Sequence, residues 1–224
     1  MSCLKITEGI HQVEGVNCNV YIVKDNDKLI LIDTGLPRND KKIIKEIESL
    51  GHKPTDVSTI VITHFHIDHV GSLKKIKDAT GAKVAVHEAD AAYVARTKDP
   101  PRPKNMMIRA LSSVVKAAPV EPDIVLKEGN KVGGLLVILT PGHSEGSISL
   151  LDSERNVMFV GDAARFMDGK IVGPPEGFTL DMAKANESIK KLAGLDFDIM
   201  LSGHGKTLQP QASKKLKEFA AGLK

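Results

Sequence analysis

The chain has 224 residues, 42% of them hydrophobic, which is enough for one sizeable core, so we expect a single domain over residues 1–224. Its 31 Lys and Arg and 28 Asp and Glu give a formal net charge of +3 and are spread along the chain. No basic stripe argues for nucleic acid, and no window approaches the roughly 18 uncharged apolar residues that a membrane span needs. We therefore expect no nucleic-acid or membrane partner.

The N-terminus and the cysteine content indicate the compartment. The opening residues MSCLKITEG contain no apolar run that could serve as a signal peptide. Two cysteines, Cys3 and Cys18, are too few for a disulfide framework and do not form a Cys-x-x-Cys pair. We expect both to be buried free thiols in a soluble, cytoplasmic protein.

Strands are predicted where short apolar runs rich in β-branched residues are bounded by turn residues. The portion of the chain up to Asp33 is typical of hairpins. The later runs are residues 29–32, 59–62, 84–86, 135–139, 157–160 and 199–201.

Three helices are predicted between and after these strands. One runs over residues 40–50 and stops at Gly51; a second is capped by Asp181 and ends before Gly194. The last follows Pro210, with one apolar stripe and with lysines on its exposed face. Its stripe is Leu216, Phe219, Ala220 and Leu223, and its lysines are Lys214, Lys215 and Lys217. Because strands and helices alternate irregularly, the pattern favours sheets with helices on their outer faces over a repeated βαβ unit.

Residues 97–123 form a separate segment with prolines at both ends and an apolar helical stretch between them. Met107, Leu111, Val114 and Val115 fall at helical spacing. The segment is either a helix that covers the core, a lid or a dimer contact, so a homodimer stays open. A second segment, residues 166–178, is rich in Gly and Pro and is predicted to be a loop. Both segments are expected to form pocket walls.

Five apolar runs each deliver an imidazole or a carboxylate at or just after their ends. These residues are Asp33, His64, His143, Asp162 and His204. Ligand sites in layered α/β proteins gather outside the carboxyl ends of strands, so we infer one shared pocket.

The stretch THFHIDHVG, residues 63–71, is the densest cluster. Residues two apart in an extended chain point to the same side, so His64 and His66 can hold one ion, while Asp68 and His69 can aim elsewhere. Neutral imidazole and carboxylate are ligands for zinc, iron and manganese. Two metal ions are therefore expected, with Asp162 as the bridge between them.

The remaining candidates have weaker patterns. His11, His52 and His87 stand without such neighbours and are interpreted as structural histidines. Asp33, in LIDTG, is either a carboxylate that orients a ligand imidazole or a residue that forms a turn or caps a helix.

Taken together, these motifs resemble those of the metallo-β-lactamase superfamily over roughly residues 10–208. The segment 64–69 matches its His-x-His-x-Asp-His signature, and IDTG, TPGH, GDA and SGHG match its other blocks in order. The resemblance implies a four-layer αββα sandwich of two mixed β-sheets with helices on the outer faces. It also implies a dinuclear site, most simply of zinc, with iron or manganese as alternatives. One ion would be held by His64, His66 and His143, the other by Asp68, His69 and His204, with Asp162 bridging.

The ligand set predicts a hydrolase of a small ester, thioester or lactone. Metal coordination lowers the pKa of water from about 16 to about 7, so a bridging hydroxide would be the nucleophile. Asp68 would orient this hydroxide and pass a proton to the leaving group, which makes it the predicted catalytic residue.

Comparison within the superfamily narrows the expected substrate, a small molecule. True β-lactamases generally lack the bridging aspartate. Glyoxalase II has a similar ligand set, but only 20 residues follow His204 here, so we expect no counterpart of its C-terminal helical domain. Lactonases tend to have a tyrosine where this chain has Arg165, which could instead hold a substrate carboxylate or phosphate, or be a surface or salt-bridged residue.

Other functions stay open from the sequence. A mononuclear iron persulfide dioxygenase is similar in fold and uses part of this ligand set. A phosphodiester hydrolase is a further alternative, although the inserted arm and basic surface of tRNA-processing relatives are not evident. A binding or scaffold module is disfavoured, because no ligand of the set is lost.

Overall fold

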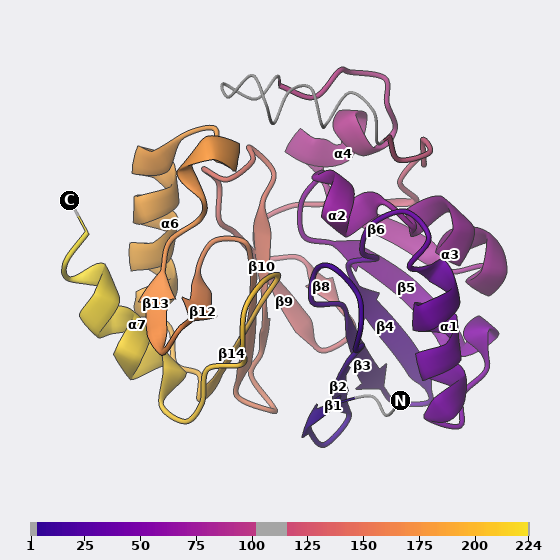
Figure 1. The fold of residues 1–224 in the computed structure, drawn as a ribbon, viewed down its shortest axis with the longest axis horizontal. Helices are drawn as coiled ribbons and strands as arrows, with labels where there is room; N and C mark the ends of the chain where they lie inside the picture. Colours follow the sequence, from indigo (N-terminus) through magenta and orange to yellow (C-terminus); the bar gives the residue numbers. More distant parts are fainter. Residues whose placement is uncertain (1–3, 102–115, 224) are drawn as a thin grey trace. The chain divides into compact units, whose positions relative to one another are not determined.

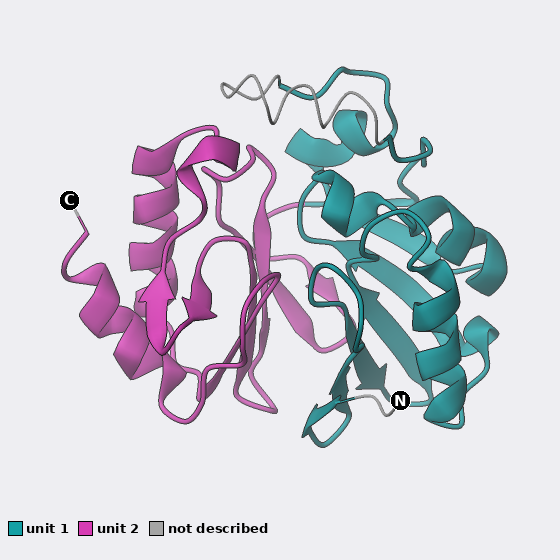
Figure 2. Cartoon of the chain, viewed as in Figure 1, with its two compact units in different colours: residues 1–126 teal, residues 127–224 magenta. Residues whose placement is uncertain are grey.

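The computed structural model describes residues 4–101 and 116–223, which form two compact units, residues 1–126 and 127–224 (Figures 1 and 2). The predicted helical positions Met107, Leu111, Val114 and Val115 lie outside the described residues, as does Cys3. Cys18 is a buried free thiol, as predicted.

The first unit is built on a seven-stranded mixed sheet in the order β1-β2-β3-β4-β5-β6-β7. Strands β1 to β4 form the predicted antiparallel hairpins, and β4 to β7 pair in parallel. The strands are β1 Leu4–Thr7, β2 Ile10–Gln12, β3 Tyr21–Asp25, β4 Lys28–Ile32, β5 Val57–Ile62, β6 Lys83–His87 and β7 Ile124–Leu126.

Helices cover one face of this sheet, where alternate strand residues point into the core. Ile43 and Ile47 of α1 and Ile76 of α3 are fully buried in one cluster with Leu31 and Ile60 of the sheet. The helical elements are α1 Asp40–Ser49, η1 Pro54–Asp56, α2 Ile67–Val70, α3 Leu73–Thr80 and α4 Glu88–Val94. The predicted helix over residues 40–50 is thus confirmed, with Leu50 as its C-cap and Gly51 at a positive φ of 81°.

The second unit holds a five-stranded mixed sheet in the order β14-β11-β10-β9-β8. Only β11 and β14 pair in parallel. The strands are β8 Lys131–Val132, β9 Leu135–Leu139, β10 Ile148–Asp152, β11 Val157–Gly161 and β14 Ile199–Ser202. The predicted runs 135–139, 157–160 and 199–201 are confirmed in β9, β11 and β14, as are the three earlier runs in β4, β5 and β6.

Two helices, α6 Met182–Ala193 and α7 Ala212–Ala220, pack on this sheet (Figure 1). Ile189 and Leu192 of α6 and Leu216 of α7 are fully buried with Met158 and Met200 of the sheet. Asp181 caps α6 as predicted, because its carboxylate accepts a hydrogen bond of 3.0 Å from the backbone N–H of Lys184. The two mixed sheets with their helices confirm the predicted α/β fold class.

The prediction of a loop over residues 166–178 is partly wrong. The chain forms a hairpin of β12 Arg165–Met167 and β13 Lys170–Val172, followed by η2 Glu176–Phe178. The turn is Asp168–Gly169, and both residues have positive φ values of 50° and 76°. Asp-Gly is a strong signal for a two-residue hairpin turn, so this hairpin was readable from the sequence.

The described helices are all too short or too polar to cross a membrane.

Candidate metal centre

In the first unit, His64, His66, Asp68 and His69 lie on the segment that leaves β5 and enters α2. Ring nitrogens of His64 and His66 lie within 4.8 Å of each other, as do those of His64 and His69. His69 Nε2 is 3.8 Å from an oxygen of Asp68. His64 and His69 are buried, whereas the side chain of Asp68 is 30% exposed. The predicted ligands of this segment are therefore close neighbours around one point of the unit.

Asp33 holds two of these imidazoles through hydrogen bonds. Its Oδ2 lies 2.8 Å from His69 Nδ1 and accepts a hydrogen bond of 2.8 Å from the Thr63 hydroxyl. The Thr63 hydroxyl oxygen in turn lies 3.1 Å from His64 Nδ1. Because the single hydroxyl proton of Thr63 goes to Asp33, this oxygen can only accept from His64. A chain of hydrogen bonds thus runs from both imidazoles to one carboxylate.

This chain fixes the tautomer of both rings. With Nδ1 protonated in His64 and in His69, the lone pair is on Nε2 of each neutral ring. A neutral imidazole with its lone pair on one ring nitrogen is what a divalent metal binds, and a carboxylate on the other nitrogen is its usual partner. The donor chemistry of the segment therefore fits a metal ion. Of the two roles left open for Asp33, its contacts are those of a carboxylate that orients ligand imidazoles.

The backbone of the ligand segment is held by a residue that the sequence analysis missed. Asp90, fully buried on α4, accepts a hydrogen bond of 3.0 Å from the backbone N–H of Phe65, between His64 and His66. Asp90 is 25 positions from Phe65, and it lies in an ordinary helical pattern. No sequence signal separates it from other helical acids.

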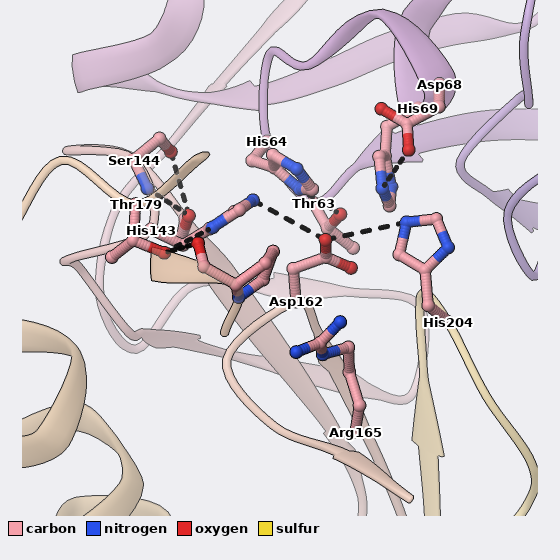
Figure 3. A network of polar contacts seen from close by, with 12 residues as sticks. Thr63, His64, Asp68, His69, His143, Ser144, Asp162, Arg165, Thr179 and His204 are labelled. Carbon is pink, nitrogen blue, oxygen red and sulfur yellow. Dashed lines mark hydrogen bonds and ion pairs between the residues drawn. The ribbon is translucent and has the colours of Figure 1, made fainter. Parts of the chain in front are cut away.

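In the second unit, Asp162 lies between two imidazoles (Figure 3). Its Oδ2 is 3.5 Å from His143 Nε2 and 3.6 Å from His204 Nε2. These separations exceed an ordinary hydrogen bond. Ligands at 2.0–2.1 Å from a tetrahedral zinc would lie about 3.3 to 3.4 Å apart, close to the observed spacing. A carboxylate between two imidazoles at this separation fits a bridging metal ligand.

His143 is positioned by Thr179. The Thr179 hydroxyl donates to the backbone carbonyl of Pro175 at 2.8 Å, and its oxygen lies 3.2 Å from His143 Nδ1. It therefore accepts from Nδ1 and leaves the lone pair of His143 on Nε2, the nitrogen that faces Asp162. In each unit, one imidazole is thus oriented by a threonine hydroxyl that donates its own proton to another acceptor.

Gly142 lets the loop before His143 pass close to helix α6. Its φ is 128°, and a Cβ atom at this position would lie 2.2 Å from the backbone nitrogen of Ala185. Only glycine fits so close an approach at a positive φ. The TPGH motif is therefore explained by packing as well as by the ligand it carries.

The other predicted structural histidines have local partners. His87 caps α4 by accepting from the backbone N–H of Ala89, and His52 lies 3.6 Å from Asp56. His11 lies in β2, where burial, the largest cause, and the charge of Lys5 lower its pKa. His87 and His52 thus have the local contacts expected of structural histidines, whereas the interpretation of His11 stays a prediction.

Residues 13–204 match the family model of the metallo-beta-lactamase superfamily. The chain therefore belongs to that superfamily, and its histidine and aspartate clusters are consistent with a metal site.

Two relatives illustrate the sequence similarity. The chain is 30% identical over 222 residues to the probable metallo-hydrolase YflN of Bacillus subtilis (strain 168), with 88% of this chain and 84% of that protein covered. It is 28% identical over 180 residues to the acyl-coenzyme A thioesterase MBLAC2 of Homo sapiens, with 70% and 61% covered.

Two solved structures illustrate the similarity in fold. BJP-1, a subclass B3 metallo-beta-lactamase of Bradyrhizobium japonicum, matches with a TM-score of 0.71 and 26% identity, over 100% of this chain and 83% of that chain. LRA-12, a class B3 di-zinc metallo-beta-lactamase from an Alaskan soil metagenome, matches with a TM-score of 0.70 and 22% identity, over 91% and 78%.

Proposed function

We propose that the protein is a metal-dependent hydrolase that cleaves a small thioester. The observation that carries the proposal is the carboxylate of Asp162 between the Nε2 atoms of His143 and His204, at 3.5 and 3.6 Å. Superfamily membership and the similarity to a probable metallo-hydrolase support hydrolysis.

Seven side chains form the proposed ligand set for two divalent ions. His64, His66 and His143 would hold one ion, and Asp68, His69 and His204 would hold the other, with Asp162 as a ligand shared by both. Bound divalent ions supply a water whose pKa is lowered toward neutrality, and they polarise the carbonyl group under attack. Zinc is the proposed metal because imidazole and carboxylate suit it and because LRA-12 is a di-zinc enzyme.

The residues around the ions contribute orientation and proton handling. Asp33, Thr63 and Thr179 orient the ligand imidazoles through Nδ1, so that Nε2 of each ring faces the proposed ions. Asp68 is the one carboxylate of the ligand segment, and its side chain is 30% exposed, so it can meet both water and substrate. It is proposed to accept a proton from the attacking water and to deliver it to the leaving thiolate.

A thioester is favoured over the ester and the lactone by the relatives. The thioesterase MBLAC2 matches 70% of this chain. A thiol leaves more readily than an alcohol, so metal activation and one carboxylate are enough for its expulsion. Cleavage adds water across the bond between the carbonyl carbon and sulfur, and yields a carboxylic acid and a free thiol.

The test is hydrolysis of a panel of acyl thioesters, esters and lactones by protein loaded with zinc, with the wild type beside Asp162→Ala and Asp68→Asn. We expect turnover of thioesters by the wild type and a loss of at least about 100-fold in each variant. A panel that includes acetyl-CoA and shows no turnover with fully loaded protein would contradict the proposal. Equal rates in the wild type and in Asp162→Ala would contradict the assigned ligand set.

A further inference from the structure

Arg165 stands beside two proposed ligands of the second unit. It is the first residue of β12 and follows Asp162 by three positions. The next residue, Phe166, forms a parallel bridge with Gly205, adjacent to His204, and its carbonyl accepts a hydrogen bond of 2.8 Å from Lys206. In Figure 3 the guanidinium of Arg165 lies next to the Asp162 side chain, below its carboxylate. The arginine is therefore fixed between two ligand-bearing loops.

The backbone around this contact leaves little freedom. A Cβ atom on Gly205, whose φ is 92°, would lie 2.5 Å from the carbonyl oxygen of Phe166. The chain that carries His204 and the strand that carries Arg165 thus approach as closely as glycine allows. This close approach keeps Arg165 at a constant position relative to His204 and Asp162.

The guanidinium itself is anchored on one edge. Its Nε and Nη2 atoms both donate to the backbone carbonyl of Gly173, at 3.2 and 2.8 Å. The residue is half-buried, and no carboxylate of the described residues lies within ion-pair distance of it. Asp162, the nearby acid, faces the two imidazoles. A neutral carbonyl therefore orients the cation without compensating its charge.

A half-buried cation without an acidic partner among the described residues keeps its charge available for an anionic ligand. Two of its five N–H groups bond to Gly173, so the Nη1 edge keeps donors in a planar, fixed arrangement. A guanidinium with one edge anchored and the other open matches the geometry of a carboxylate or a phosphate oxygen pair. Its pre-organisation reduces the entropy lost on binding.

We propose that Arg165 binds an anionic group of the substrate, a carboxylate or a phosphate, and so makes the enzyme selective for anionic thioesters. This inference rests on the proposed function. The anionic group is carried either by the acyl part or by the thiol part of the substrate, and both present the same oxygen chemistry to the guanidinium.

The experiment compares matched pairs of substrates. S-succinyl-N-acetylcysteamine and S-(4-methylpentanoyl)-N-acetylcysteamine have the same shape and differ in the acyl carboxylate. S-acetyl-4′-phosphopantetheine and S-acetylpantetheine differ only in the phosphate of the thiol part. Arg165→Gln and Arg165→Lys are assayed beside the wild type. Lys170→Gln is the control, since it removes one positive charge from the same hairpin at an exposed position.

For one of the two pairs, Arg165→Gln is expected to lower kcat/KM for the anionic member by about 10- to 100-fold, as for a lost charge-assisted hydrogen bond. The neutral member should change by less than about threefold. For the anionic member, kcat/KM of Arg165→Lys should lie between those of the wild type and Arg165→Gln, and kcat/KM of Lys170→Gln should equal that of the wild type. Equal losses on anionic and neutral members, or none on either, would overturn the inference.

Binding measured by calorimetry with succinate and with CoA decides the same question without turnover. The wild type should bind one of these anions at least about 10-fold more tightly than Arg165→Gln. Equal binding of both anions by both proteins overturns the role of Arg165. Unchanged metal content in Arg165→Gln serves as the check on folding. If no thioester is hydrolysed but the difference in binding is present, the proposed reaction fails while the anion site stands.

Discussion

Oδ2 of Asp33 lies 2.8 Å from Nδ1 of His69, and both side chains are buried. The same carboxylate accepts hydrogen bonds from the backbone and the hydroxyl of Thr63, both at 2.8 Å. Asp33 has a positive φ of 62°, a conformation that Asp tolerates better than most residues. One buried carboxylate thus determines how two proposed metal ligands present their nitrogens.

Asp33→Asn should weaken metal binding. An amide has one acceptor oxygen, and its NH2 group would face His69 or Thr63 with donors. At least one of the imidazoles of His64 and His69 would then have to change its tautomer. Loss of such an outer hydrogen bond typically lowers metal affinity 10- to 100-fold, and we expect about that loss in a competition titration with a chelator. Asp56→Asn is the matched control, because Asp56 lies 3.6 Å from a histidine outside the ligand set, His52. Wild-type affinity in Asp33→Asn would contradict this account.

Thr179→Val should weaken metal binding less than Asp33→Asn does. Valine has nearly the same shape but cannot accept from His143 Nδ1, so that ring loses the Thr179 acceptor. We expect about a 10-fold loss of zinc affinity. Thr179→Ser keeps the hydroxyl and should therefore keep most of the wild-type zinc affinity. A serine variant as weak as the valine variant would show that Thr179 acts through packing.

Gly142→Ala should destabilise the loop that carries His143. The added methyl group would overlap the backbone of Ala185, at 2.2 Å from its nitrogen, in a conformation that is already strained for alanine. We expect a loss of about 2 to 4 kcal/mol in the free energy of unfolding, measured by denaturant titration. Gly134→Ala, where a Cβ meets no atom within 4 Å, should stay within about 0.5 kcal/mol of the wild type. Similar stabilities of the two variants would refute the packing argument.

Asp123 provides a pH-dependent contribution to stability. Its carboxylate accepts hydrogen bonds from Lys77 at 2.6 Å and from the backbone N–H of Val84 at 2.8 Å. These contacts, led by that of Lys77, lower the pKa of Asp123 below its ordinary value of 3.8. The stabilisation is therefore fully present above about pH 4 to 5, and is lost as the pH falls through the lowered pKa of the folded state.

Asp123→Asn should accordingly be less stable than the wild type at pH 7, by about 1 kcal/mol or less, because the pair is exposed to solvent. The difference should shrink as the pH falls below the ordinary value and should be near zero at about pH 2. Thermal unfolding of both proteins across this range measures it. A difference in stability between the two proteins that grows toward acid pH would contradict a lowered pKa for Asp123.

The proposed ligand set could be chosen from the sequence because each of its members follows an apolar run or falls in one dense motif. His64, Asp162 and His204 each come just after a strand, so their positions could be read without the fold. Thr179 and Asp90 could not be found in this way. Thr179 is 36 positions from His143, and Asp90 is 25 from Phe65; both are ordinary residues until folding brings them to their partners.

The hairpin of β12 and β13 was missed for a different reason. The high Gly and Pro content of residues 166–178 outweighed the Asp168–Gly169 turn signal, although that dipeptide sits between two short apolar runs. The placement of Arg165 at the start of a strand, anchored on Gly173, followed from this hairpin. The start of β12 at Arg165 could therefore have been derived from the turn signal, whereas the hydrogen bonds of Arg165 to the carbonyl of Gly173 could not.

Elemental analysis of the wild type and of Asp162→Ala, both purified without added metal or chelator, tests the metal centre most directly. We expect about two zinc ions per chain in the wild type, and about one or fewer in the variant, since the proposed bridging carboxylate is lost. A wild type that holds no divalent metal, or a variant that keeps the full wild-type content, would contradict it.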